Sequence, residues 1–217
     1  MLHRSSLSSA ALVGSMLLLA GCGDDRAPEA QAPAGAAAAH APASAPAPDP
    51  TAGLSEVKHV ELHGWVSEAP DYTNALTLQQ GTESQPANLS IAFTGGDKDK
   101  SAVRKTITGT IVPASGVIII EVTNPNDFVV PLTIAIKTGK SWTFHESERV
   151  AIAAHSKAPQ RVVFDLSKAT FKSAETQWKN TGTIGELDQA KELQIGVYNG
   201  KQSGSLVVSD VDIRSRP

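Results

Sequence analysis

Residues 116–140 read GVIIIEVTNPNDFVVPLTIAIKTGK, and they indicate the fold class more clearly than other parts of the chain. It holds two runs rich in β-branched residues on either side of an Asn-Pro-Asn-Asp segment, a pattern typical of two strands joined by a turn. Within each run, every second residue is aliphatic. Because successive side chains of a strand point to opposite faces, each run predicts a strand with one wholly aliphatic face.

A third run, Leu193–Tyr198, shows the same alternation. The three aliphatic faces consist of Ile118, Ile120 and Val122, of Leu132, Ile134 and Ile136, and of Leu193, Ile195 and Val197. We expect these faces to form the core between two sheets. The opposite faces mix polar, small and aromatic side chains, so they predict either a solvated surface or a ligand groove.

Similar short runs, separated by Gly, Asn, Asp and Pro, continue through residues 54–217. Many strands at this spacing, without long helices between them, predict an all-β domain with an antiparallel β-sandwich fold. The expected strands are Val57–Trp65, Leu76–Gln80, Asn88–Thr94, Val103–Thr110, Gly116–Thr123, Phe128–Lys137, Ser141–Glu146, Arg149–Ala153, Gln160–Asp165, Glu192–Tyr198 and Ser205–Ile213. One helical turn is expected over Gly185–Ala190.

Residues 1–21 have the pattern of a signal peptide, in which a short basic start precedes the apolar stretch Ala10–Ala20. The tetrapeptide Leu19-Ala20-Gly21-Cys22 resembles the bacterial lipobox. The resemblance implies cleavage before Cys22, a diacylglyceryl group on its thiol and a further fatty-acyl chain, such as palmitate, on its amine. Gly23 follows where the inner-membrane retention pattern has aspartate, so we expect a lipoprotein of the bacterial cell envelope, at the outer membrane.

Residues 22–53 predict a disordered tether between this lipid anchor and the folded domain. Residues 27–50 contain 12 Ala and 6 Pro. Frequent proline prevents a helix, and nothing in the segment is bulky enough to build a core.

Cysteine use and charge exclude several function classes. Cys22 is the only cysteine, which leaves no partner for a disulfide and no thiol nucleophile within the domain. The net charge is −3, and it becomes −4 without residues 1–21, which hold one basic and no acidic side chain. This weakly acidic balance argues against nucleic acid as a partner.

Three segments resemble carbohydrate-binding modules of the jelly-roll, galactose-binding-like class. They are 122–147, which includes Val122-Thr123-Asn124-Pro125-Asn126-Asp127 and Ser141-Trp142-Thr143-Phe144-His145-Glu146-Ser147, then 163–178, and the final strand 204–211. The resemblance covers most of residues 55–217 and implies a jelly-roll fold and a glycan ligand. Its motifs are structural more than functional.

The resemblance also implies a structural calcium ion, which in many such modules is held by an aspartate of the last strand. That position is Ser209 in this chain, with Asp210 beside it. Glu61, Asp210 and Asp212 could supply oxygen ligands. We predict no required cofactor and no metal site, with calcium as the alternative. A zinc site at His59, Glu61 and His63, completed by His145 or His155, is a second alternative to an ordinary polar strand face.

No catalytic constellation is evident in the sequence. There is no Gly-x-Ser-x-Gly motif. A pair of carboxylates could still act on a polysaccharide, and Glu121 and Glu146 are the best-placed acids. We therefore predict a protein that is not an enzyme.

Sugar rings stack on aromatic side chains while their hydroxyl groups need polar partners. On this basis we predict a carbohydrate-binding site made of Tyr198, Gln194, Trp178, Glu121, Lys137 and Trp142, with Thr133 on the same face. Packing in the core is the alternative for Trp142.

The sequence thus predicts a membrane-anchored, non-catalytic, polysaccharide-binding lipoprotein. One alternative is a structural or interaction lipoprotein that binds an envelope protein with the same sheet face. The other is a polysaccharide-active enzyme.

Overall fold

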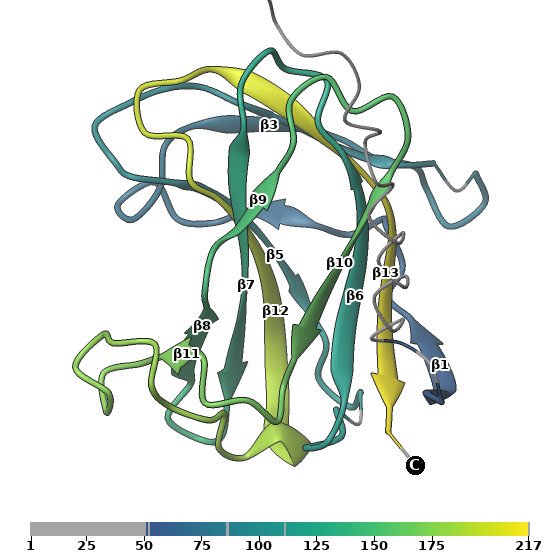
Figure 1. The fold of residues 1–217 in the computed structure, drawn as a ribbon, viewed down its shortest axis with the longest axis vertical. Helices are drawn as coiled ribbons and strands as arrows, with labels where there is room; N and C mark the ends of the chain where they lie inside the picture. The colour runs from purple at the N-terminus through teal and green to yellow at the C-terminus, as the bar shows by residue number, and fades with distance from the viewer. Residues whose placement is uncertain (1–50, 52, 86, 111, 217) are drawn as a thin grey trace, which may run out of the picture. The chain divides into compact units, whose positions relative to one another are not determined.

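The computed structural model describes residues 51, 53–85, 87–110 and 112–216 (Figure 1). The predicted signal peptide, Cys22 and all of the tether except Thr51 and Gly53 lie outside the described residues. No helix in the described part of the chain has the length and apolar character needed to cross a membrane.

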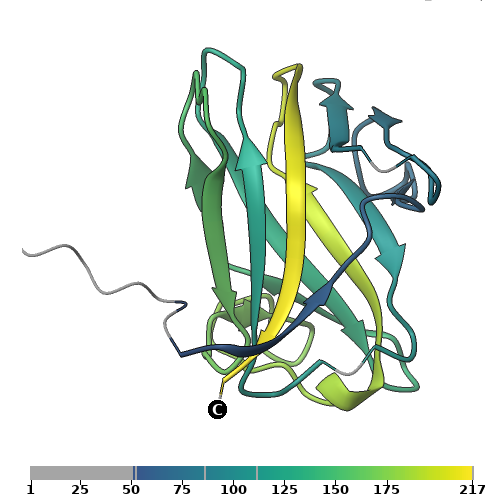
Figure 2. The same ribbon diagram turned by 90° about the vertical axis from the view of Figure 1, so that its right-hand side faces the viewer.

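Two antiparallel sheets form the domain (Figures 1 and 2). The first sheet has the order β10 (Gln160–Asp165), β6 (Val117–Thr123), β13 (Gly204–Ser215), β4 (Leu89–Phe93) and β3 (Leu76–Gln79), with β1 (Ser55–His59) paired to the C-terminal part of β13. The second sheet has the order β11 (Phe171–Lys172), β8 (Thr143–Ser147), β7 (Val130–Thr138), β12 (Ala190–Val197), β5 (Ser101–Thr106) and β2 (Val66–Ser67), with β9 (Val150–Ile152) paired to β7. The predicted all-β sandwich is confirmed.

The three predicted aliphatic faces meet between the sheets. Side chains of β6 in the first sheet and of β7 and β12 in the second are fully buried in one hydrophobic cluster, at Ile118, Ile120, Val122, Leu132, Ile134, Ile136, Leu193, Ile195 and Val197. Burying each such side chain contributes about 1.5–3 kcal/mol relative to exposure. The alternation read from the sequence therefore places the core correctly.

The predicted strand Val57–Trp65 is wrong in its second half, because β1 ends at His59. The chain turns at Gly64, whose φ of 74° favours glycine. Trp65 is buried, and its backbone N–H donates to the side chain of Gln80 (3.0 Å) while that amide donates back to the Trp65 carbonyl (3.0 Å). Residues 60–65 thus form a loop that the buried indole holds in place.

Other differences are local. The turn over Gly185–Ala190 is confirmed as the 3₁₀ helix η1 (Leu187–Gln189). The predicted strand Ser141–Glu146 begins instead at Thr143, which leaves Trp142 in the turn between β7 and β8. The two-residue strands β2 and β11 are too short to leave a pattern in the sequence.

The core makes a direct prediction for stability. Replacing Ile195 with Ala removes a fully buried side chain between the sheets. We expect the free energy of unfolding to fall by about 2–5 kcal/mol in urea denaturation. The matched control is Val129→Ala, whose side chain is exposed and should change stability by about 0.5 kcal/mol or less. Equal losses in the two variants would contradict this placement of the core.

Candidate functional site

The second sheet turns its charged and polar side chains away from the core. Strand register brings them together, because Gln194 of β12 pairs with Ala135 of β7 and Arg104 of β5, and Ala135 pairs with Glu146 of β8. We call the resulting surface the charged face, and it consists of Glu68, Lys100, Arg104, Lys137, Glu146, Lys172, Glu192, Gln194 and Tyr198.

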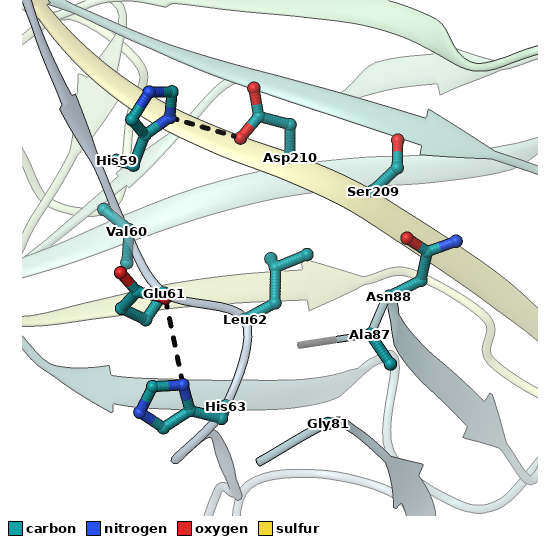
Figure 3. A pocket seen from close by; sticks show the side chains of 10 residues that line it. All are labelled: His59, Val60, Glu61, Leu62, His63, Gly81, Ala87, Asn88, Ser209 and Asp210. Atoms are coloured by element: carbon teal, nitrogen blue, oxygen red, sulfur yellow. Dashed lines mark ion pairs between the residues drawn. The ribbon is translucent and has the colours of Figure 1, made fainter. Parts of the chain in front are cut away.

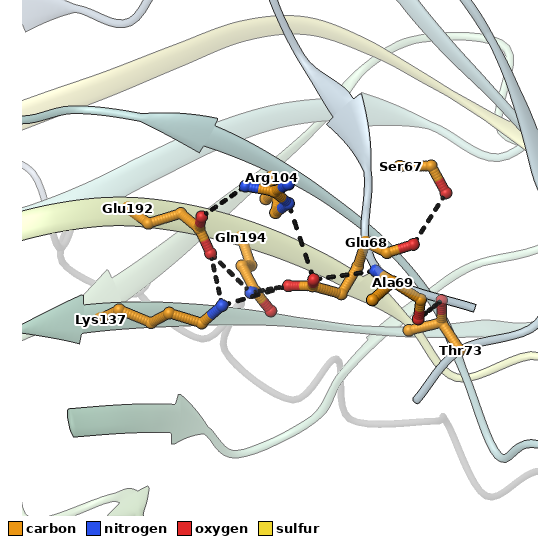
Figure 4. Close-up of polar contacts among 8 residues, drawn as sticks. All are labelled: Ser67, Glu68, Ala69, Thr73, Arg104, Lys137, Glu192 and Gln194. Atoms are coloured by element: carbon orange, nitrogen blue, oxygen red, sulfur yellow. Dashed lines mark hydrogen bonds and ion pairs between the residues drawn. The ribbon is translucent and has the colours of Figure 1, made fainter. Parts of the chain in front are cut away.

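One half of the charged face centres on Glu192, whose side chain is only 3% exposed (Figure 4). Its carboxylate accepts hydrogen bonds from Arg104 Nη1 (2.9 Å) and Gln194 Nε2 (2.9 Å), and Lys137 Nζ lies 2.8 Å away. Glu68, from the segment after β2, joins the same group, because Lys137 and Gln194 both donate to its Oε2. The two carboxylates are thus held by shared donors.

The other half centres on Glu146, which is equally buried. Lys100 Nζ (2.8 Å), the Tyr198 hydroxyl (2.8 Å) and the Thr133 hydroxyl (3.2 Å) donate to its Oε1, and Lys172 Nζ lies 3.1 Å from Oε2. The Glu146 carboxylate therefore brings together four partner side chains, each from a different segment of the chain. A buried carboxylate in a protein needs such pairing, because burial without it is costly.

These partners decide the charge of both acids. Burial alone would raise the pKa of Glu146, but the charges of Lys100 and Lys172 and the hydrogen bond from Tyr198 outweigh it, so the pKa is lowered. Burial would also raise the pKa of Glu192, and the hydrogen bonds from Lys137, Gln194 and Arg104 lower it in the same way. Both carboxylates are therefore ionised at neutral pH.

Between the two halves lies a cavity of about 410 Å³, a size that accommodates a small ligand. Its polar lining comes from both halves of the charged face, and its apolar lining is aromatic. The lining residues are Glu68, Tyr72, Thr73, Lys100, Lys137, Phe144, Glu146, Trp178 and Gln194. Figure 4 shows the side chains of Glu68, Lys137 and Gln194 converging on one another.

Two of the aromatic rings are open to solvent. The exposed fractions of Tyr72 and Trp178 are 75% and 58%, and the Trp178 ring lies 6.3 Å from the ring of Phe144. Trp178 has a φ of 62°, which is rare for a bulky residue. The turn that imposes it is held by a hydrogen bond from the Trp178 N–H to the Ser173 carbonyl (2.9 Å). Strained backbone of this kind is concentrated at ligand sites.

The structure brings four of the predicted binding residues to this face. Lys137, Gln194 and Trp178 line the cavity, whereas Tyr198 lines a neighbouring pocket that shares Tyr72 and Lys100 with it. The ring of Tyr198 is covered by the guanidinium group of Arg149, 3.6 Å from the ring centroid. Tyr198 therefore belongs to the charged face, and Arg149 occupies one face of its ring.

Glu121 and Trp142 are not brought to the cavity. Glu121 lies on β6 of the first sheet, opposite Arg161 and Asp210 of its neighbouring strands, so the expectation that it shares this face is wrong. Trp142 is exposed in the turn before β8, under the ammonium group of Lys191 (4.8 Å), which also excludes the alternative of core packing.

Tyr72, Phe144 and Glu68 were missed by the sequence prediction. Tyr72 and Glu68 belong to the loop after β2, whose path cannot be read from alternation. Phe144 precedes Glu146 by two residues on β8, so the two side chains lie on the same face of the strand. This spacing could have predicted Phe144 from the sequence.

The implied calcium ligands do not come together. Asp210 and Asp212 lie near His59, whereas Glu61 faces His63 at 3.9 Å (Figure 3). Calcium prefers about six to eight oxygen ligands. Here the third group beside the carboxylates of Asp210 and Asp212 is the His59 imidazole, which offers a nitrogen. These residues do not fit calcium. The alternative zinc set of His59, Glu61 and His63 is divided in the same way.

The charged face predicts how stability depends on pH. Because the pKa of Glu146 is lowered by folding, its contribution is present above the pKa of the unfolded chain and is lost as pH falls through the folded value. We expect the free energy of unfolding to fall below about pH 4.3. Glu146→Gln should cost about 1.5–3 kcal/mol at pH 7 and make the loss in acid shallower.

Urea denaturation from pH 3 to pH 8 measures both effects. The matched control is Glu148→Gln, because Glu148 is exposed two residues along the same segment. Identical pH profiles for Glu146→Gln and the unmodified chain would contradict the assigned role of Glu146.

Comparison with known proteins finds structures with a similar fold. No family model and no curated protein matches the sequence. Among solved structures, the family 11 carbohydrate-binding module from Clostridium thermocellum, in complex with a β-1,3-1,4-mixed-linked tetrasaccharide, has a TM-score of 0.51 at 11% identity, over 74% of this chain and 96% of that one. The xylan-binding module of family 15 has a TM-score of 0.50 at 14% identity, over 75% and 99%. The described domain therefore has the jelly-roll β-sandwich fold of carbohydrate-binding modules.

Proposed function

We propose that this protein is a carbohydrate-binding lipoprotein without catalytic activity. The observation that carries the proposal is the cavity on the charged face, where exposed aromatic rings lie beside polar side chains that are held in place. We call these polar side chains the polar floor, and they are Glu68, Lys100, Lys137, Glu146 and Gln194. The C–H faces of a sugar ring stack on Trp178 and Tyr72, and its hydroxyl groups bond to the floor. The structural neighbours include a module in complex with a tetrasaccharide, which agrees with a ligand of this class.

The polar floor is suited to binding because it is already ordered. Each of its carboxylates is held by at least two donors, so little freedom is lost when a ligand arrives. The ammonium group of Lys100 has three protons and donates one to Glu146, which leaves donors for sugar hydroxyl groups. Gln194 donates through its Nε2 atom, and its amide oxygen can accept.

The same network argues against catalysis. Glycoside hydrolysis needs a carboxylic acid that holds its proton near neutral pH. The pKa values of Glu146 and Glu192 are shifted in the opposite direction, as described above. Glu121, the other acid that the sequence offered, lies on the first sheet. Binding is therefore the function that the charged face supports best.

Anchoring at Cys22 completes the proposal. A lipid anchor with two or more acyl chains binds a membrane stably, whereas one chain binds marginally. The Ala- and Pro-rich segment that follows Cys22 gives the domain reach, because such chains extend by about 3.1 Å per residue. The domain would then present its charged face to glycans in the bacterial envelope, at the outer membrane.

The binding site is tested with Trp178→Ala. We expect the unmodified chain to be retained in affinity gel electrophoresis by at least one soluble polysaccharide, in a panel that includes mixed-linkage β-glucan and xylan. Trp178→Ala should weaken that retention about tenfold or more, because it removes the stacking ring.

The matched control is Trp142→Ala, since Trp142 is also exposed and also has a positive φ, but lies outside the cavity. Circular dichroism checks that both variants fold. Lack of retention on every polysaccharide, or an equal loss in the two variants, would contradict the proposed site.

The anchor is tested with Cys22→Ser. In a bacterial host, we expect the unmodified chain to incorporate labelled palmitate and to sediment with membranes. The variant should lose the label and appear in the soluble fraction, because it lacks the thiol that accepts the lipid. Palmitate labelling that survives the substitution would contradict lipidation at Cys22.

A further inference from the structure

The first and last strands of the domain bring three metal-binding side chains together. His59, the last residue of β1, pairs in register with Asp212 of β13, and Asp210 lies two residues earlier on the same face of β13. One ligand atom from each of the three lies within 4.8 Å of the others. The cluster is on the first sheet and is separate from the charged face.

The buried carboxylate of Asp212 distinguishes this cluster from a solvated group of charges. Its side chain is 2% exposed, and Arg214 holds Oδ2 through two hydrogen bonds of 2.7 and 3.3 Å. The other oxygen, Oδ1, is buried and accepts no hydrogen bond from the described residues. His59 Nδ1 lies 2.6 Å from Oδ1, within ion-pair distance when the imidazole is protonated, but the contact lacks hydrogen-bond geometry. A buried acceptor left without a hydrogen bond is unfavourable, so it needs an explanation.

The ligand atoms select the kind of ion. One imidazole nitrogen and two carboxylate oxygens suit Zn²⁺ and similar first-row divalent ions, whereas calcium requires more oxygen ligands. Arg214 orients Asp212 from behind, which is the role of an outer-shell partner in many metal sites. We propose that His59, Asp210 and Asp212 bind a divalent transition-metal ion such as Zn²⁺.

The site is reachable from solvent. His59 and Asp210 are partly exposed and line a second cavity of about 410 Å³, in which Figure 3 shows their side chains facing each other. Three protein ligands leave a fourth position for water. A bound ion would join β1 to β13 and so strengthen the pairing of these two strands.

Titration with ZnCl₂ tests the proposal. The untagged chain carries Cys22→Ser, which removes a thiol that would itself bind zinc, and is first treated with a chelator. We expect binding of one equivalent in isothermal titration calorimetry and a rise in Tm of roughly 5 °C at saturating zinc. CaCl₂ at the same concentration should leave Tm unchanged. Cobalt(II) bound in place of zinc should give visible d–d absorption.

The variants His59→Gln and Asp210→Asn separate this site from other groups. Both side chains are partly exposed, so folding should survive, and each substitution should weaken zinc binding about tenfold or more. His63→Gln is the matched control, because His63 lines the same cavity but faces Glu61. If zinc does not bind, the three residues form only an ion pair, and the proposal is overturned. An equal loss on His63→Gln, or stabilisation by calcium equal to that by zinc, would also overturn it.

Discussion

Alternation along β7 and β12 is the constraint on which the rest of this domain depends. Each aliphatic residue that faces the core forces its neighbour to the opposite side of the second sheet. On β12 those neighbours include Glu192 and Gln194, which are buried although they face away from the core. A buried carboxylate is tolerated only with close partners, and adjacent strands supply them through Lys137 and Arg104. The same alternation of residues thus produces the core on one face of the sheet and the charged face on the other.

The charged face has the properties of a prepared binding surface. Its polar groups are fixed to one another before any ligand arrives. Glu146 and Glu192 are held ionised, which suits recognition of hydroxyl groups more than proton transfer. The rings that would contact a sugar come from loops at the edge of the sheet. One of them, Trp178, is displayed by a backbone conformation that few large residues adopt. A rigid floor with aromatic loops is an arrangement that allows one fold to serve different ligands.

The sequence predicted what depends on local periodicity. The core, the sandwich and the shared face of Lys137 and Gln194 all follow from alternation, and the structure confirms them. Features that depend on register between distant strands were not predictable. Glu121 has the same outward orientation, but belongs to the other sheet. His59 meets Asp212 because β1 pairs with β13 in one particular register, which the pattern of neither strand predicts.

In the proposed function, the charged face and not another surface holds the glycan. The chain has three tryptophans, and each reports on a different place: Trp65 in the core, Trp142 in an exposed turn and Trp178 at the cavity. The most direct measurement is a titration of the ¹⁵N-labelled chain with an oligosaccharide of a polysaccharide that retains it, followed through the three indole N–H signals by NMR. We expect the Trp178 signal to shift while those of Trp65 and Trp142 stay in place. A shift of Trp142 with Trp178 unmoved, or no shift of any signal, would contradict it.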